Sequence, residues 1–148
     1  MRLAQVSQPV RDLARAVRFY ERVLGAPALA VYDPPGIAFF DLDGARLMLS
    51  ADEGGSDEGV FDEGVSDEDA GGAGGARGSR LYLVVDDVPA ALERWRSAGA
   101  LVVGEPHVIF RHEDDTLGPA GHDEWQAFAQ DSEGNTVGLV GWEVAPAG

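Results

Sequence analysis

Two stretches of this sequence follow the same plan, and this duplication constrains the fold more than any other feature. Residues 5–24 have the pattern of a strand, a capped turn and an amphipathic helix, and residues 80–98 repeat it 75 positions later. A second match, offset by 90 positions, pairs residues 40–50 with residues 130–140. The first match pairs Val10 with Val85, Asp12 with Asp87, Leu13 with Val88, Ala16 with Ala91, Val17 with Leu92 and Tyr20 with Trp95. The repeat is too long for a solenoid, so it predicts a duplicated half-domain.

Each copy predicts a strand, a helix and further strands, which together make an α+β fold of tandem βαβββ units. The first helix is expected to begin after Asp12, as N-cap, and to end at Gly25, because apolar residues recur between them at helical spacing. The second helix is expected between Asp87 and Gly99. The expected strands are residues 3–10, 28–33, 36–42, 45–50, 80–85, 101–103, 107–111, 125–130 and 136–142.

The length of 148 residues fits a single domain with a sizeable core. We predict that residues 1–50 and 80–143 form the two units, that residues 51–79 link them and that residues 144–148 are a tail. The absence of cysteine excludes disulfides, thiol nucleophiles and cysteine-based zinc sites. No apolar run reaches the roughly 18 residues of a membrane span, and the N-terminus lacks a signal-peptide pattern, so we expect a soluble cytoplasmic protein.

The predicted linker is acidic and rich in glycine. Its nine acids and one base contribute −8 to the net charge of −15 and leave −7 for the rest of the chain. Such a composition buries too little apolar surface to fold, which favours a flexible segment. A calcium loop is the alternative, but its ligands alternate along the chain, whereas Asp-Glu-Gly recurs here every five residues. Because the rest of the chain is acidic too, we expect neither nucleic acid nor a membrane as partner.

Two tandem units would cover one face of each sheet with a helix and leave concave faces around a cleft for a ligand. Alternation along the strands assigns each side chain to one of these faces. The side chains expected to face the cleft are Gln5, Ser7, Met48, Arg80, Tyr82, Val84, Thr136 and Gly138. Those expected to face the helices are Val6, Leu47, Leu49, Leu81, Leu83, Val137 and Leu139.

Two motifs carry a resemblance to a known family. The helix motif D-L-x-x-A-x-x-F-Y-x-x-V-L-G at residues 12–25 and the turn motif D-x-E-G-N at residues 131–135 stand in register with each other. The chain thereby resembles the vicinal oxygen chelate superfamily, which includes glyoxalase I, methylmalonyl-CoA epimerase, extradiol dioxygenases and bleomycin and fosfomycin resistance proteins. The resemblance implies the glyoxalase/bleomycin resistance fold over nearly the whole chain outside the acidic segment. It is less specific for function, because one fold hosts many activities.

The resemblance also locates the metal position of the family. Metal-dependent members carry His, Glu or Gln at four equivalent strand positions, which correspond here to Gln5, Met48, Arg80 and Gly138. Only Gln5 could bind a hard divalent ion, since a thioether is a poor ligand, a guanidinium repels cations and glycine has no side chain. We therefore expect no metal and no cofactor. Glyoxalase or epimerase chemistry would need a metal and a glutamate base that these positions lack.

Three histidines and Glu124 are the remaining candidates for chemistry. We predict that His107, His112 and His122 are surface or strand-edge residues, because two of them fall in or beside a polar loop at residues 113–123. The alternative is a metal site, or a general acid or base, built from His112 and Glu124.

Arg80 and the aromatic residues are open to two interpretations each. Arg80 could bind a ligand carboxylate or phosphate with help from Gln5 and Tyr82, or it could pair with one of the many acids. Trp125, Phe128 and Trp142 are predicted to be core residues, although Trp125 could form a wall of the cleft.

The sequence favours a metal-independent protein that binds a small organic molecule, as in sequestration or drug resistance. Its expected ligand-binding residues are Gln5, Ser7, Met48, Arg80, Tyr82, Trp125 and Gly138. The rival is a glyoxalase-like or epimerase-like lyase or isomerase with a relocated metal, or with Arg80 as electrophile and Glu124 or a loop histidine as base. The resemblance implies a homodimer, within which the two units could pair in one chain or exchange between two.

Overall fold

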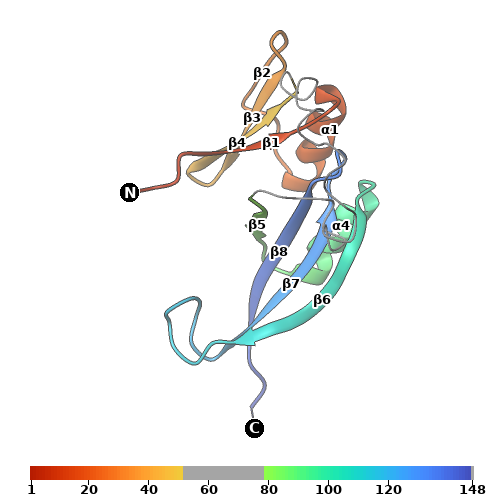
Figure 1. The fold of residues 1–148 in the computed structure, drawn as a ribbon. Coiled ribbons are helices and arrows are strands. Elements are labelled where there is room, and N and C mark those ends of the chain that lie inside the picture. The colour runs from red at the N-terminus through yellow and green to blue at the C-terminus, as the bar shows by residue number, and fades with distance from the viewer. Residues whose placement is uncertain (52–78, 148) are drawn as a thin grey trace, which may run out of the picture. The chain divides into compact units, whose positions relative to one another are not determined.

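The computed structural model describes residues 1–51 and 79–147, which divide into two compact units (Figure 1). Unit 1 comprises Met1–Gly75 together with Ser132–Asn135, and unit 2 comprises Ala76–Asp131 and Thr136–Gly148. The predicted linker lies outside the described residues except for its two ends, and so does the calcium-loop alternative. No helix within the described part of the chain is long and apolar enough to cross a membrane.

Unit 1 is a four-stranded mixed sheet with one helix. Its elements are β1 (Gln5–Pro9), α1 (Leu13–Leu24), β2 (Ala30–Tyr32), β3 (Ile37–Leu42) and β4 (Ala45–Ser50). The strands lie in the order β1-β4-β3-β2, with β1 parallel to β4 and the other pairs antiparallel. This is the predicted βαβββ unit, with β1 and β2 shorter at both ends than expected.

Helix α1 forms where the sequence predicts it. The Asp12 side chain accepts a hydrogen bond from the Arg15 N–H at 3.0 Å, and Gly25 ends the helix with a left-handed φ of 72°. The buried face consists of Leu13, Ala16, Phe19, Tyr20 and Val23. Phe19 thus lies in the core, while Val17 and Leu24 are half-buried.

The turn at Ser132–Asn135 belongs to unit 1 because it holds the start of α1. The Glu133 carboxylate accepts hydrogen bonds from the backbone N–H groups of Arg11 and Asp12 at 2.8 and 3.0 Å. It also accepts one from the Arg15 guanidinium at 2.8 Å. A carboxylate at a helix N-terminus satisfies unpaired N–H groups and is favoured by the helix dipole.

Unit 2 repeats the architecture with longer strands. Its elements are β5 (Leu81–Val84), α4 (Val88–Ser97), β6 (Leu101–Arg111), β7 (His122–Gln130) and β8 (Thr136–Val144). The strand order β5-β8-β7-β6, with β5 parallel to β8, matches that of unit 1. Asp87 caps α4 by accepting from the Ala90 N–H at 3.0 Å.

The long hairpin of unit 2 differs from the prediction. Residues 101–103 and 107–111 are parts of one strand, β6, which keeps pairing with β7 through register shifts around Gly104. A side chain at 104 would place its Cβ 3.2 Å from the Phe128 ring, so glycine suits this close approach. Strand β7 begins at His122 rather than Trp125, because its polar first residues still pair with β6 and β8.

Most side chains predicted to face the helices are buried, while Val6 and Leu83 are half-buried. Leu47 and Leu49 in unit 1, and Val137 and Leu139 in unit 2, are 0 % exposed. Each helix packs on one face of its own sheet, α1 against β3 and β4 and α4 against β6, β7 and β8. The opposite face of each sheet, called its open face below, carries the candidate ligand-binding residues other than Trp125.

Candidate functional site

Polar side chains link three neighbouring positions on the open face of unit 1. The Gln5 amide oxygen accepts a hydrogen bond from Arg46 Nε at 2.9 Å, and its nitrogen lies 3.8 Å from the Met48 sulfur. Ser7 is exposed and lies beside Met48 in the β1–β4 register. The structure therefore brings together the three ligand-binding residues predicted in this half of the chain.

An aromatic residue that the sequence analysis missed lies on the same face. Phe39 is directly opposite Met48 in the β3–β4 register. The Arg46 guanidinium lies 5.8 Å from the Phe39 ring centre, and the Tyr32 ring meets the Phe39 ring edge-on at 6.3 Å. Alternation along β3 and β4, applied to Phe39 and Arg46 as it was to Met48, would have found both.

In unit 2 aromatic rings cover the position equivalent to Met48. Gly138 lies between Tyr82 on β5 and Phe128 on β7, its register partners. A Cβ at 138 would be 2.7 Å from the Tyr82 ring and 3.0 Å from the Phe128 ring, closer than side chains pack. The two rings meet edge-on with centres 5.9 Å apart. Glycine at this position therefore allows both rings to close over the strand.

Arg80 stacks on this aromatic pair. Its guanidinium lies 5.8 Å from the centre of the Phe128 ring, and the residue is exposed. Arg80 forms no ion pair with any acid in residues 1–51 and 79–147. Of the two interpretations left open by the sequence, these contacts favour an arginine available to a ligand.

Trp125 does not share this face. The β7–β8 register runs without a shift, so Glu124, Gln126 and Phe128 point to one side of the sheet. Trp125 points to the other side, with Ala127 and Ala129, which are 0 % exposed. The expectation that Trp125 forms a wall beside Tyr82 and Gly138 is therefore wrong, because its odd position in β7 turns it toward the helix side.

Glu124 lies on the open face of unit 2, as Phe128 does, and its carboxylate accepts three hydrogen bonds. Its Oε1 accepts from His112 Nε2 at 2.8 Å and from Trp142 Nε1 at 3.3 Å, while Oε2 accepts from the Gln126 amide at 2.8 Å. Burial acts to raise the pKa of Glu124, but the hydrogen bonds from His112, Gln126 and Trp142 outweigh it and lower that pKa below its usual value. The carboxylate is therefore ionised at neutral pH.

His112 is buried, with 2 % of its surface exposed, so the predicted surface position is wrong for this residue. The hairpin end folds back over it, and a Cβ at Gly118 would lie 2.8 Å from the imidazole. His107 and His122 instead donate from Nδ1 to the carbonyl oxygens of Glu105 and Ala120 at 2.9 and 3.0 Å. Tertiary packing distinguishes the three histidines, which look alike in the sequence.

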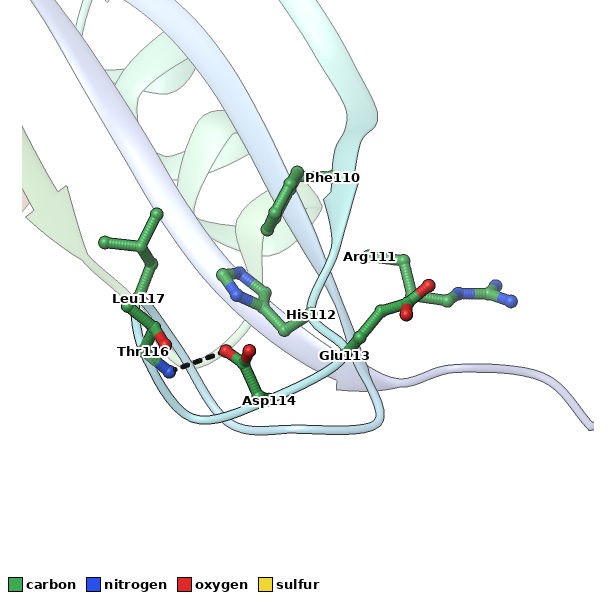
Figure 2. Close-up of a pocket in the computed structure, with 7 residues that line it drawn as sticks. All are labelled: Phe110, Arg111, His112, Glu113, Asp114, Thr116 and Leu117. Atoms are coloured by element: carbon green, nitrogen blue, oxygen red, sulfur yellow. Dashed lines mark hydrogen bonds between the residues drawn. The ribbon is translucent and has the colours of Figure 1, made fainter.

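An open hollow of about 430 Å³ lies beside His112. Figure 2 shows the imidazole pointing into the space between Phe110, Leu117 and Asp114, while the Arg111 guanidinium points away from it. The residues that line the hollow are Phe110, Arg111, His112, Glu113, Asp114, Thr116 and Leu117. The sequence analysis singled out His112 and Glu124 but could not place a hollow there.

Comparison with known proteins identifies the family. The family model of the Glyoxalase/Bleomycin resistance protein/Dioxygenase superfamily matches residues 2–139. The chain belongs to this superfamily. No curated protein matches the sequence.

Solved structures of this superfamily share the fold at low sequence identity. A glyoxalase-related enzyme from Fulvimarina pelagi is 19% identical with a TM-score of 0.65, and the match covers 99% of this chain and 92% of that one. A glyoxalase/bleomycin resistance protein/dioxygenase from Alicyclobacillus acidocaldarius is 17% identical with a TM-score of 0.60, covering 95% and 91%. TioX from Micromonospora sp. ML1 is 22% identical with a TM-score of 0.58, covering 95% and 98%.

The family's metal position does not fit a divalent ion in this chain. Gln5 already bonds Arg46, Met48 offers a thioether, Arg80 carries a positive charge and Gly138 lies under two rings. In residues 1–51 and 79–147, no three His, Asp or Glu side chains are grouped so that they could hold a metal ion.

Proposed function

We propose that this superfamily member binds a small organic molecule without a metal ion, through the open faces of its sheets. The observation that carries the proposal is the Tyr82–Phe128 pair closed over Gly138, where metal-dependent members place a ligand. Aromatic rings at that position provide an apolar surface that a planar ligand can stack on. Sequestration or resistance is the corresponding biological role, and it requires binding without turnover.

Arg80 gives the proposed site its polar anchor. A guanidinium without an ion pair among the described residues can bind a ligand carboxylate or phosphate through two parallel hydrogen bonds. The phenol of Tyr82, which is 49% exposed, supplies a further donor or acceptor nearby. In unit 1, Gln5 and Ser7 offer polar groups beside Met48 and Phe39. The ligand expected at Arg80 and Tyr82 is a planar organic anion.

The test combines metal analysis with a ligand screen on untagged protein. We expect no bound metal, no stabilisation by Ni, Zn, Mn or Fe(II), and stabilisation by planar organic anions. Arg80→Gln should weaken their binding by about tenfold or more, because a charge-assisted pair is lost. Arg94→Gln, which removes an equally exposed arginine from α4, is the matched control and should leave binding unchanged.

Stoichiometric metal, or turnover of a bound compound, would overturn the proposal in favour of a glyoxalase-like or epimerase-like enzyme. The proposal also includes the cytoplasm as the place of action and a homodimer as the working form. Sedimentation of the purified protein at several concentrations tests the dimer, and a monomer at all of them would contradict it.

A further inference from the structure

The hairpin end of unit 2 contains a histidine held in one orientation. His112 is 2 % exposed, its Nε2 lies 2.8 Å from Glu124 Oε1, and its ring meets the Phe110 ring edge-on at 4.7 Å. Gly118 covers one edge of the imidazole and Trp142 shares the carboxylate. A buried imidazole that is bonded on one side and packed on two others has a fixed ring orientation.

The Glu124 carboxylate also decides which nitrogen of His112 is basic. An ionised carboxylate only accepts hydrogen bonds, so Nε2 must carry a proton. In the neutral imidazole the lone pair is then on Nδ1, as when a carboxylate sets the tautomer of a catalytic histidine. Nδ1 has no hydrogen-bond partner among the described residues. His112 therefore brings an unused acceptor to the lining of the hollow.

The loop around this hollow is braced by its own hydrogen bonds. The His112 N–H donates to the His122 carbonyl at 2.9 Å, and the Gly121 N–H donates to the His112 carbonyl at 2.8 Å. Between these ends, Asp114 accepts from the Thr116 N–H at 3.0 Å, and Asp115 accepts from the Ala120 N–H at 2.8 Å. These hydrogen bonds join the two ends of the loop and form two turns within it.

The charge of the lining favours a cation. Hydrogen bonds from Thr116 lower the pKa of Asp114, which therefore stays ionised near His112. The Glu113 carboxylate points away from the hollow, on the same side as the Arg111 guanidinium (Figure 2). The one base of the lining, Arg111, is neutralised by Asp123, whose oxygens accept from its guanidinium at 2.6 and 3.1 Å. A ligand carboxylate would therefore meet the charge of Asp114, whereas an ammonium group would meet no unpaired positive charge among the lining residues.

We propose that the hollow beside His112 binds a small organic amine in its protonated form. The ammonium group donates a hydrogen bond to Nδ1, Asp114 supplies the opposite charge, and Phe110 and Leu117 contact the apolar part of the ligand. Phe110 and Leu117 are 47% and 75% exposed, so both offer apolar surface, and the Phe110 face can also attract the cation. This site goes beyond the proposed metal-free function and does not depend on it.

The first test observes the tautomer without any ligand. Nitrogen-15 NMR of the imidazoles at neutral pH should show His112 with a protonated Nε2 and a bare Nδ1. The reverse tautomer, or an imidazole protonated on both nitrogens, would leave no acceptor facing the hollow and would overturn the proposal.

The second test compares matched probes. Benzylamine, which is cationic at neutral pH, should shift the His112 and Phe110 signals and bind at least about tenfold more tightly than benzyl alcohol. Benzoate should not bind in the hollow. Equal binding of the amine and the alcohol, or no binding of the amine, would contradict the proposal.

Variants separate the site from general effects of charge. His112→Gln should weaken benzylamine binding by about tenfold, because the bare imidazole nitrogen is lost. Asp114→Asn, on the exposed loop, should weaken it several-fold and tests the site even if the His112 variant unfolds. The controls are His107→Gln, whose Nδ1 is already bonded to a carbonyl, and Glu93→Gln on α4, which removes one charge elsewhere. Unchanged affinity in Asp114→Asn, or equal loss in a control, would overturn the proposal.

Discussion

In unit 1 the open face of the sheet is held by polar side chains, whereas in unit 2 aromatic rings cover it. Gln5 and Met48 occupy the positions that Arg80 and Gly138 occupy in the other copy. Each face nevertheless retains a phenylalanine opposite the second of these positions, Phe39 or Phe128, with an arginine over its ring. The helix-covered faces have stayed apolar in both. In both units the face that packs against the helix is apolar, whereas the residue types on the open face differ between the units. Packing against a helix therefore limits the residue types on one face of each sheet and not on the other.

The equivalent core residues of the two units should show the largest effects. Trp95→Ala should lower the free energy of unfolding by about 3–5 kcal/mol, and Tyr20→Ala by a similar amount, because each leaves a large cavity. Both side chains are nearly inaccessible, at 2 % and 0 % exposed. Urea unfolding measures the loss, with the exposed Arg94→Ala as control. A small loss in only one unit would mean that the two cores are not equivalent.

Gly138→Ala should displace the Tyr82 ring in unit 2, because the added Cβ overlaps it. The free energy of unfolding should fall by about 1–3 kcal/mol. Met48→Ala, the matched change in unit 1, introduces no overlap. In a double-mutant cycle with Tyr82→Ala, most of the cost of Gly138→Ala should disappear. Additive effects in the cycle would show that Tyr82 does not close over Gly138.

The two helix caps, Asp12 and Asp87, should contribute equally to the free energy of unfolding. Asp12→Ala and Asp87→Ala should each lower stability by about 1 kcal/mol, because each leaves a helix N–H without its acceptor. Replacement by serine keeps an acceptor and should restore most of the loss. If only the Asp87 variant loses stability, the Glu133 carboxylate, which still accepts from the Arg11 and Asp12 N–H groups, holds the start of α1 without the cap.

The smallest expected effect is on the dependence of stability on pH. Burial acts to raise the pKa values of Glu124 and Glu133, but hydrogen bonds outweigh it and lower both. The ionised carboxylates therefore contribute stability that is fully present above the usual pKa of 4.5 and is lost as pH falls through the lower folded-state value. Glu124→Gln and Glu133→Gln should each flatten the fall in urea midpoint on acidification. An unchanged slope in either variant would contradict the assigned hydrogen bonds.

Local pattern was sufficient for most of the fold. Helix α1 begins after Asp12 and ends at Gly25 as predicted, and β4 has the predicted bounds of residues 45–50, because caps, turns and apolar spacing act over a few residues. The prediction failed in the hairpin of residues 101–130, where Gly104 and the polar start of β7 looked like breaks. The pairing of β7 with both β6 and β8 holds these residues in strands, and no local pattern encodes that support.

For the candidate sites, too, local pattern predicted some features correctly and could not predict others. Alternation correctly brought Gln5, Ser7 and Met48 to one face, and Tyr82 and Gly138 to another, because side chains in a strand alternate strictly. It could not show that Tyr82 and Phe128 close over Gly138, since that depends on three strands at once. Trp125 was misplaced because the alternation was not applied to β7, where residues 125 and 128 point to opposite faces.

The sequence by itself determined the duplicated βαβββ plan and the helix boundaries, because residue type and spacing are local properties. Only the tertiary structure decided that His112 is buried against Glu124 and that Arg80 lies over Phe128. His112 and Glu124 are separated by a loop that folds back, and a pairing of this kind arises only when strands β6, β7 and β8 assemble.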